Sequence, residues 1–203
     1  MKNCVASVKE HIGRVVAGTG VVCVTAVMAF ALTHAAKAGD WSPAQIAKYR
    51  TAAQTGDADA QWMLGYAYAY GKGVPKDDAQ AVKWYHRAVQ QDYAKAQNNL
   101  GAMYASGDGV PEDDSTAVKW YTKAAEQGDA LGQYNLGTMY ANGEGVPKDN
   151  VRAYLWFNLA ATQGHAGAKE NKNRLEEDMT PADTSRAQTL SRKCLEKSYK
   201  DCG

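Results

Sequence analysis

The chain has 203 residues and a formal charge of +1, because 23 lysine and arginine residues nearly balance 22 acidic residues. This length allows one ordinary domain and a short additional segment. The balanced charge argues against a strongly basic face of the kind that captures nucleic acid, so we expect no nucleic-acid partner.

Residues 1–38 differ in composition from the rest of the chain. Basic residues precede an uncharged run over residues 15–32, and the small residues Ala36 and Ala38 follow it. This arrangement is typical of a secretory signal peptide that is cleaved after Ala38. The run is also just long enough to span a membrane, which makes an uncleaved anchor the alternative. Contact with a membrane is expected only through this segment.

Both alternatives place the rest of the chain on the far side of the membrane, since the positive charge lies ahead of the apolar run. We therefore expect a periplasmic or secreted protein, or alternatively one anchored in the inner membrane and facing the periplasm. Cys4 and Cys23 lie within residues 1–38 and would leave with a cleaved signal peptide.

Residues 39–57 carry the signals of a single capping helix. Ser42 is a suitable N-cap, and Pro43 follows it at the first helical position. Tyr49 lies 36 residues before Tyr85, so this segment matches the second half of the unit that follows. We interpret it as a half-repeat that closes the N-terminal end of the array.

Three units of 36 residues come next, over residues 58–93, 94–129 and 130–165. Each unit has a Leu-Gly pair in its first half, Gly-x-Gly-Val-Pro in its middle and Ala-x-x-Trp-aromatic in its second half. The Leu-Gly pairs are Leu64-Gly65, Leu100-Gly101 and Leu136-Gly137. Self-similarity at such a period indicates a solenoid, in which one supersecondary unit stacks on its copies.

Each unit is predicted to be two antiparallel helices joined by a loop. In the second unit, Tyr104 lies on the buried stripe of the first helix, and the segment 107–111 with its glycines and proline ends that helix. Asp113 is placed to cap the second helix. Gly101 also lies on the buried stripe, where glycine costs ~1 kcal/mol relative to alanine. Its recurrence therefore predicts a close approach of the two helices.

Residues 166–203 are predicted to form two capping helices and a disulfide-bonded tail, with the last helix beginning after Thr180. Cys194 and Cys202 are the only cysteines after residue 38, and in an exported protein we expect them to pair. An unbroken helix between them would hold their Cα atoms about 12 Å apart. A disulfide requires less than ~7 Å. The last helix should therefore end soon after Cys194.

This pattern resembles Sel1-like repeats, which are relatives of tetratricopeptide repeats. The family pattern Ala-x-x-x-Leu-Gly-x-x-Tyr, Gly-x-Gly-Val-Pro-x-Asp and Ala-x-x-Trp-Tyr-x-x-Ala-Ala-x-x-Gly matches all three units closely, and the resemblance covers about residues 44–200. It implies an all-α protein, an α/α solenoid of three 36-residue helix-loop-helix repeats with N- and C-terminal capping helices. It also implies a non-enzymatic scaffold or adaptor whose curved surface binds a protein or peptide partner in the envelope.

One cysteine-rich subgroup of such proteins has been described as penicillin-binding or hydrolysing, so a cell-wall-associated protein that binds or hydrolyses peptidoglycan or β-lactam-like substrates is the alternative. Those relatives carry a cysteine pair in every repeat, whereas this chain has no cysteine within its repeats. Of the histidines after residue 38, His86 is expected at a solvated position and His165 in a cap or turn. No pairing of nucleophile and base is recognisable. We expect no enzymatic activity, no cofactor and no metal site.

Variable positions on the first helices are the candidates for partner binding, because the resemblance implies that these helices line a concave face. Aromatic side chains there offer a large contact area, and amides can pair with a peptide main chain. The candidates are Trp62, Asn98 and Tyr134 at one level, Tyr66 and Thr138 one turn on, and Tyr70 and Asn142 a further turn on. The competing interpretation is that Trp62 and Tyr66 only pack against the N-terminal capping helix.

Overall fold

The structure is a computed structural model that describes residues 41–200 and 202. The predicted signal peptide, with its alternative as an anchor, lies outside these residues and stays a prediction. Among the described residues, no helix is both long enough and apolar enough to cross a membrane.

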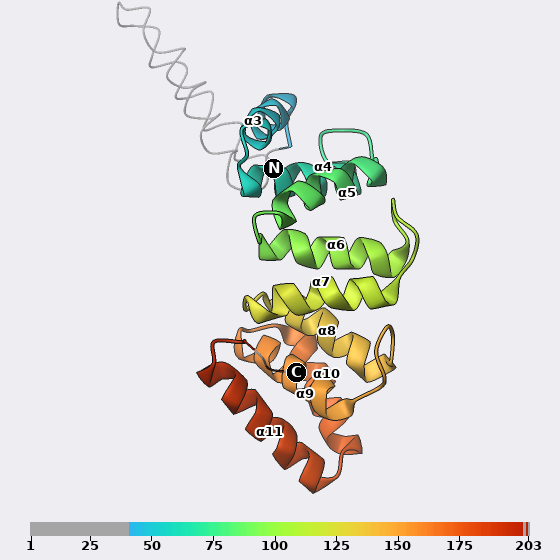
Figure 1. Ribbon diagram of the computed structural model, residues 1–203, viewed down its shortest axis with the longest axis vertical. Coiled ribbons are helices and arrows are strands. Elements are labelled where there is room, and N and C mark those ends of the chain that lie inside the picture. The colour runs from blue at the N-terminus through green and yellow to red at the C-terminus, as the bar shows by residue number, and fades with distance from the viewer. Residues whose placement is uncertain (1–40, 201, 203) are drawn as a thin grey trace, which may run out of the picture. The chain divides into compact units, whose positions relative to one another are not determined.

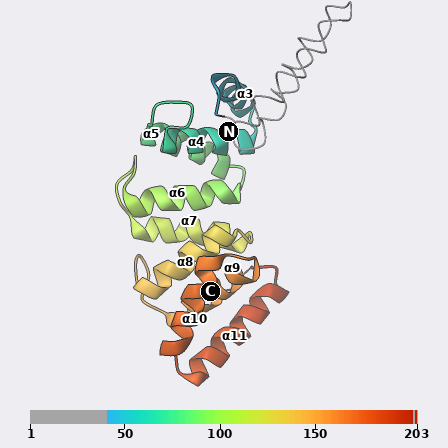
Figure 2. The same cartoon turned by 180° about the vertical axis from the view of Figure 1, so that it is seen from behind.

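Residues 41–200 form nine α-helices and no strand, which confirms the predicted all-α class. The helices α3 to α10 stack in chain order (Figure 1; seen from behind in Figure 2). The pairs α4–α5, α6–α7 and α8–α9 each form one repeat. The helices are α3 (Pro43–Gln54), α4 (Ala58–Tyr70), α5 (Asp78–Val89), α6 (Ala94–Ser106), α7 (Asp114–Glu126), α8 (Ala130–Asn142), α9 (Asn150–Thr162), α10 (Ala166–Asp178) and α11 (Pro181–Glu196).

The helix ends follow the predicted signals. Asp113 precedes α7 and its Oδ1 accepts a hydrogen bond from the Thr116 amide at 3.0 Å. Hydrogen bonds from Thr116 hold the pKa of the Asp113 carboxyl below its ordinary value. At the other end of the loop, Gly107 terminates α6 with φ at 72°, a left-handed conformation that glycine adopts without steric cost. Ser42 and Thr180 cap α3 and α11 as predicted.

The recurrent glycine of each first helix faces an aromatic ring of the second helix. A Cβ added to Gly101 would lie 2.8 Å from the ring of Tyr121, closer than real side chains approach. Gly65 and Gly137 face Tyr85 and Phe157 in the same way. The predicted close approach of the paired helices is therefore confirmed, and the missing side chain is what allows the ring to pack there.

Buried glutamines at the start of the first helices bond to the end of their own unit, and Gln133 bonds to the preceding unit as well, a feature that the sequence did not predict. The Gln133 side chain is fully buried at the start of α8, and its Nε2 donates to the carbonyl of Ala125 on α7. Its Oε1 accepts from Nε2 of Gln163, which follows α9. Gln97 accepts from Gln127 in the same register, at 2.7 Å. Burial of these amides is tolerated because they are hydrogen-bonded.

The tryptophans of the second helices α5 and α7 pack toward the preceding unit. Trp120 on α7 lies against the hydrophobic cluster of α5 and α6. Trp84 on α5 lies against the cluster of α3 and α4. The core is thus a series of hydrophobic clusters along the array, and the tryptophans pack one unit against the cluster of the unit before it.

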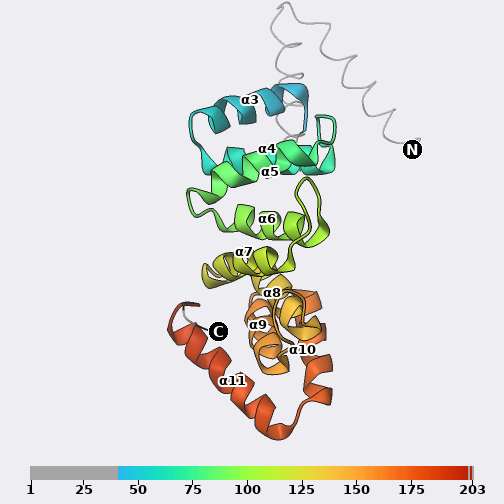
Figure 3. The same ribbon diagram turned by 45° about the vertical axis from the view of Figure 1, so that its right-hand side comes forward.

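The C-terminal helix α11 packs against α9 (Figure 3). Two leucines of α9, Leu155 and Leu159, are fully buried in the same cluster as Cys194 of α11. In the first two repeats, lysine and arginine stand at the positions of these leucines. The third repeat therefore carries apolar residues at two positions that are charged in the other repeats, because α11 covers them there.

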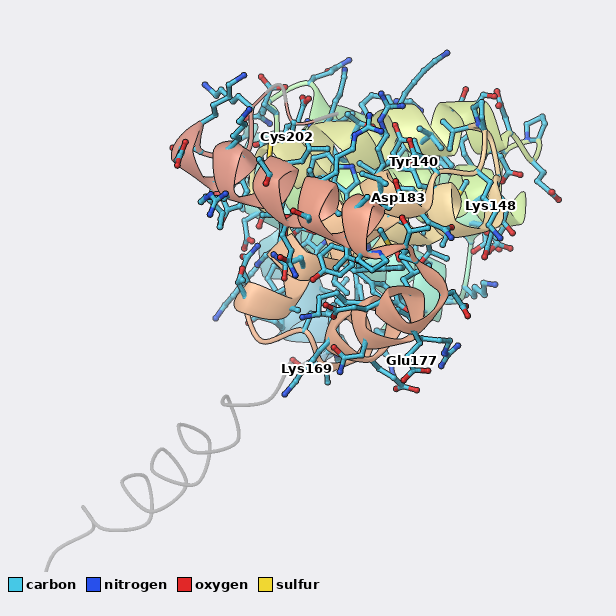
Figure 4. The ribbon with its side chains drawn as sticks, turned by 90° about the horizontal axis from the view of Figure 1, so that it is seen from below. Tyr140, Lys148, Lys169, Glu177, Asp183 and Cys202 are labelled. Carbon is cyan, nitrogen blue, oxygen red and sulfur yellow. A yellow bond between two sulfur atoms is a disulfide. The ribbon has the colours of Figure 1, made fainter. Side chains whose placement is uncertain are left out.

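The helix α11 ends at Glu196, and the chain then turns back, as the cysteine spacing predicted. Cys194 and Cys202 form a disulfide with their Cα atoms 5.1 Å apart (Figure 4). Between them, Tyr199 adopts a left-handed conformation with φ at 69°. A Cβ added to Gly128 would lie 2.9 Å from the Tyr199 ring. The C-terminal tail therefore packs at the junction of the second and third repeats.

Candidate interaction surface

The first helices α4, α6 and α8 carry the predicted partner-binding residues, and α6 and α8 are in direct contact. We call the face that these residues form the first-helix face. Its candidate residues are Trp62, Tyr66, Tyr70, Asn98, Tyr134, Thr138 and Asn142.

An aromatic row runs along α4 in the first repeat. Tyr66 lies between Trp62 and Tyr70, with ring centroids 6.1 Å and 4.4 Å away. Tyr66 also stacks on Trp41 at 5.6 Å, ahead of the N-terminal capping helix. Tyr70 is 59% exposed. Tyr66 therefore does pack against the N-terminal cap region, whereas Tyr70 at the end of the row faces solvent.

Trp62 is held by the end of its own repeat and the start of the next one rather than by the N-terminal cap. Its ring centroid lies 6.1 Å from that of Tyr93, and the Lys95 ammonium lies 5.0 Å above it. Trp62 also packs against the cluster of α5 and α6. The ring is only partly exposed and one of its faces carries a cation, so it offers a partner less area than the sequence suggested.

Asn98 is 6% exposed, so the expectation that it is freely exposed is wrong. Because α6 and α8 touch, Asn98 is enclosed between them, and its Oδ1 accepts from Nδ2 of Asn135 at 2.8 Å. Its own Nδ2 donates to Asn99, which in turn donates to the Tyr85 hydroxyl at 2.9 Å. Burial raises the pKa of Tyr85, so this hydroxyl stays neutral.

Asn99 and Asn135 were missed by the sequence reading although they are 36 residues apart. Both side chains are half-buried. The recurrence of asparagine at one register position, where the first repeat has Met63, was the available signal.

Tyr134 packs within the third repeat and against the start of α10. Its ring stacks on His165 at a centroid distance of 4.4 Å and lies 5.7 Å from the ring of Phe157. One turn on, the Thr138 hydroxyl donates to the Tyr134 carbonyl at 3.1 Å. Tyr134 therefore helps to pack the third repeat against α10, whereas Thr138 lines a cleft.

A cleft of about 190 Å³ lies between α8, α9 and α10 and includes two of the predicted residues, Thr138 and Asn142. Arg174 on its wall pairs with Glu170 at 3.2 Å, and Asn142 donates to Glu144 at 3.2 Å. The remaining lining residues are Ala141, Phe157, Asn171, Leu175 and Asp178. The lining thus combines apolar side chains with amides and both signs of charge.

The two histidines have structural surroundings. His165 precedes α10, and its Nδ1 accepts from the Ala168 amide at 3.0 Å, which confirms the predicted cap. His86 is not solvated as expected, because its ring lies edge-on to Trp120 and is half-buried. Burial lowers the pKa of His86. Within the described residues, no group of three or more His, Cys, Asp or Glu is placed to hold a metal ion.

The helix pairs, the buried glutamines and the stacked cores define the class of protein, an α/α solenoid of helix-loop-helix repeats. The model of the Sel1 repeat family matches residues 58–93, 94–129 and 130–165, which are the units predicted from the period. The chain belongs to the Sel1 repeat family, whose fold is typically a protein-interaction scaffold.

Two solved structures are similar to this chain. A Sel1 repeat protein from Oxalobacter formigenes is 37% identical, with a TM-score of 0.58, over 64% of this chain and 98% of that one. A protective antigen present in uropathogenic Escherichia coli strains, which displays an SLR fold, is 29% identical with a TM-score of 0.59. That match covers 77% of this chain and 42% of the antigen. Comparison with curated proteins finds no significant match.

Proposed function

We propose that this protein is a non-enzymatic adaptor of the bacterial envelope that binds a segment of a protein partner along the first-helix face. The proposal of an envelope location depends on the signal-like composition of residues 1–38. The proposal of a binding role depends on the family and on the chemistry of this face.

The proposal depends mainly on one observation, that side chains of successive first helices contact each other along the face. Lys95 of α6 covers Trp62 of α4, and Asn135 of α8 donates to Asn98 of α6. Thr138 of α8 then shares a cleft with α10. An extended segment laid across these helices would meet aromatic rings, then amides and then the cleft.

This order of side chains suits a peptide. Tyr70 supplies exposed aromatic area at one end, and aromatic residues are the common energetic centres of protein interfaces. The half-buried amides of Asn99 and Asn135 lie where main-chain groups of an extended segment can pair with them. Because neighbouring residues fix these side chains in advance, little conformational entropy is lost on binding.

A capture experiment with two exposed positions of the face tests the proposal. The full chain and the double variant Tyr70→Ser, Asn142→Lys are immobilised and exposed to envelope extract. Both residues are exposed, so the variant is expected to fold with unchanged helicity. We expect one protein to be retained by the native chain and at least tenfold less by the variant.

Leu195→Ser is the matched control, since Leu195 is 42% exposed on α11 and far from the proposed surface in the sequence. This variant should capture the partner as well as the native chain does. Retention of cell-wall material alone, or equal capture by all three forms, would contradict the proposal.

A further inference from the structure

The outward positions of the second helices differ between repeats in a regular way. Counting by the period of 36, Lys83 on α5 corresponds to Lys119 on α7 and to Leu155 on α9. Arg87 and Lys123 correspond in the same way to Leu159. Two positions of the repeat therefore carry cations in the first two repeats and leucines in the third.

In the third repeat, another helix covers these two positions. Leu155 and Leu159 are fully buried, and α11 packs against α9 over them. The buried residues of α11 are small and lie at helical spacing, namely Ala187, Ser191 and Cys194. The fold thus shows that the outer side of a second helix accepts another helix.

In the first two repeats, the same positions face solvent. Lys83, Arg87, Lys119 and Lys123 are all exposed. The guanidinium of Arg87 lies 4.4 Å above the Trp84 ring, and the ammonium of Lys123 lies 4.7 Å above the Trp120 ring. We call these four cations and two tryptophans the second-helix strip.

The two halves of the strip are adjacent, because Trp120 of α7 meets His86 of α5 edge-on at 6.2 Å. Acidic residues of these helices lie in the terminal turns. Asp78 starts α5 and pairs with Lys76 at 3.1 Å, and Asp114 and Glu126 occupy the two ends of α7. The middle of the strip is therefore uniformly basic, with half-buried aromatic rings beneath the cations.

We propose that the second-helix strip docks an acidic amphipathic helix of a protein partner, in the manner in which α11 covers α9. This site is separate from the first-helix face, since it is built from the second helices. Cations four residues apart on each helix match carboxylates at i and i+4 of a partner helix. Small residues between those carboxylates would reach the tryptophan rings, as Cys194 of α11 packs in one cluster with the leucines of α9.

The probe is a fluorescent 16-residue helical peptide of alanine and glutamate, with its glutamates at i and i+4 along one face. A peptide of the same composition in scrambled order controls for charge alone. The full chain is expected to bind the helical peptide at least tenfold more tightly than the scrambled one. Binding should weaken as salt is raised, because exposed charges are screened beyond about 10 Å at 0.1 M salt.

The test variant carries Lys83→Gln, Arg87→Gln, Lys119→Gln and Lys123→Gln. Its matched control removes four exposed lysines elsewhere, at Lys72, Lys148, Lys169 and Lys193. We expect affinity for the helical peptide to fall at least tenfold in the first variant and less than twofold in the second. Circular dichroism of both variants establishes that the helices are retained.

Three results would overturn the proposal. Equal loss of binding in both variants would mean that only the overall charge attracts the peptide. Equal affinity for the helical and scrambled peptides would exclude docking of a helix. Binding to vesicles of phosphatidylglycerol without binding to either peptide would assign the strip to a lipid surface.

Discussion

The ring of Tyr134 on α8 stacks on the ring of His165 at the start of α10, with centroids 4.4 Å apart and planes inclined by 26°. Trp62 and Tyr93 pair at the equivalent positions of the first repeat. A side chain on one first helix is thus held by the residue that begins the next first helix. This contact fixes the spacing of the helices that form the first-helix face.

His165 has two separable roles, and two substitutions distinguish them. His165→Asp keeps a cap of the kind that Asp129 provides for α8, but it removes the stack on Tyr134. His165→Ala removes both. We expect a loss of ~0.5–1.5 kcal/mol in unfolding free energy for the aspartate variant and about 1 kcal/mol more for the alanine variant. Urea denaturation measures the difference, and equal losses would mean that the cap contributes nothing.

Gly101→Ala is expected to destabilise the protein, although alanine is the better helix former by ~1 kcal/mol. The added Cβ would lie 2.8 Å from the Tyr121 ring, and overpacking of this kind costs ~1–3 kcal/mol. In a Tyr121→Leu background the same substitution should cost less, because the planar ring no longer lies against the helix. Thermal or urea unfolding of the four proteins gives the coupling, and additive effects would refute the proposed contact.

Stability should fall at acidic pH in part because of His86. Burial lowers the pKa of His86 below its ordinary value of 6.5. The folded protein therefore takes up the proton at a lower pH than the unfolded chain does. As pH falls below 6.5, the unfolded state binds more protons and the free energy of unfolding decreases. His86→Gln should show a shallower loss between pH 7 and pH 5 in urea titrations. An unchanged slope would contradict the burial of this ring.

The C-terminal disulfide should hold α11 on α9. Cys202→Ser opens a short loop, for which the chain-entropy estimate is ~2–3 kcal/mol. Tyr199 lies between the two cysteines and packs at Gly128, so this contact at the repeat junction should loosen as well. We expect faster hydrogen exchange in α11 and at Leu155 and Leu159 of α9, with α4 to α6 unchanged. Uniform exchange along the array would contradict this local role.

The sequence predicted the repeat boundaries, the helix caps and the close approach of the paired helices at the recurrent glycine because each depends on residues close together within one period. Gly101, Asp113 and Cys194 are examples of residues whose local chemistry determines their place. These features needed no knowledge of how neighbouring units face each other.

The contacts between units could not be predicted in the same way. Asn98 was expected at the surface, yet the direct contact of α6 with α8 encloses it. The Gln133 amide donates across a repeat boundary to the carbonyl of Ala125 on α7, so its partner depends on how neighbouring units pack. Leu155 and Leu159 did signal that α9 is covered, because they replace cations, although the sequence does not say which segment covers them.

Site-specific photo-crosslinking in cells tests whether the first-helix face binds a single envelope protein. A benzophenone side chain is placed at Tyr70 and, separately, at Asn142, which lie at opposite ends of the first-helix face, with Leu195 and Lys169 as control positions. We predict that Tyr70 and Asn142 crosslink to the same envelope protein and that the control positions do not. Crosslinks to different proteins, to none, or equally from all four positions would contradict the assignment of this face.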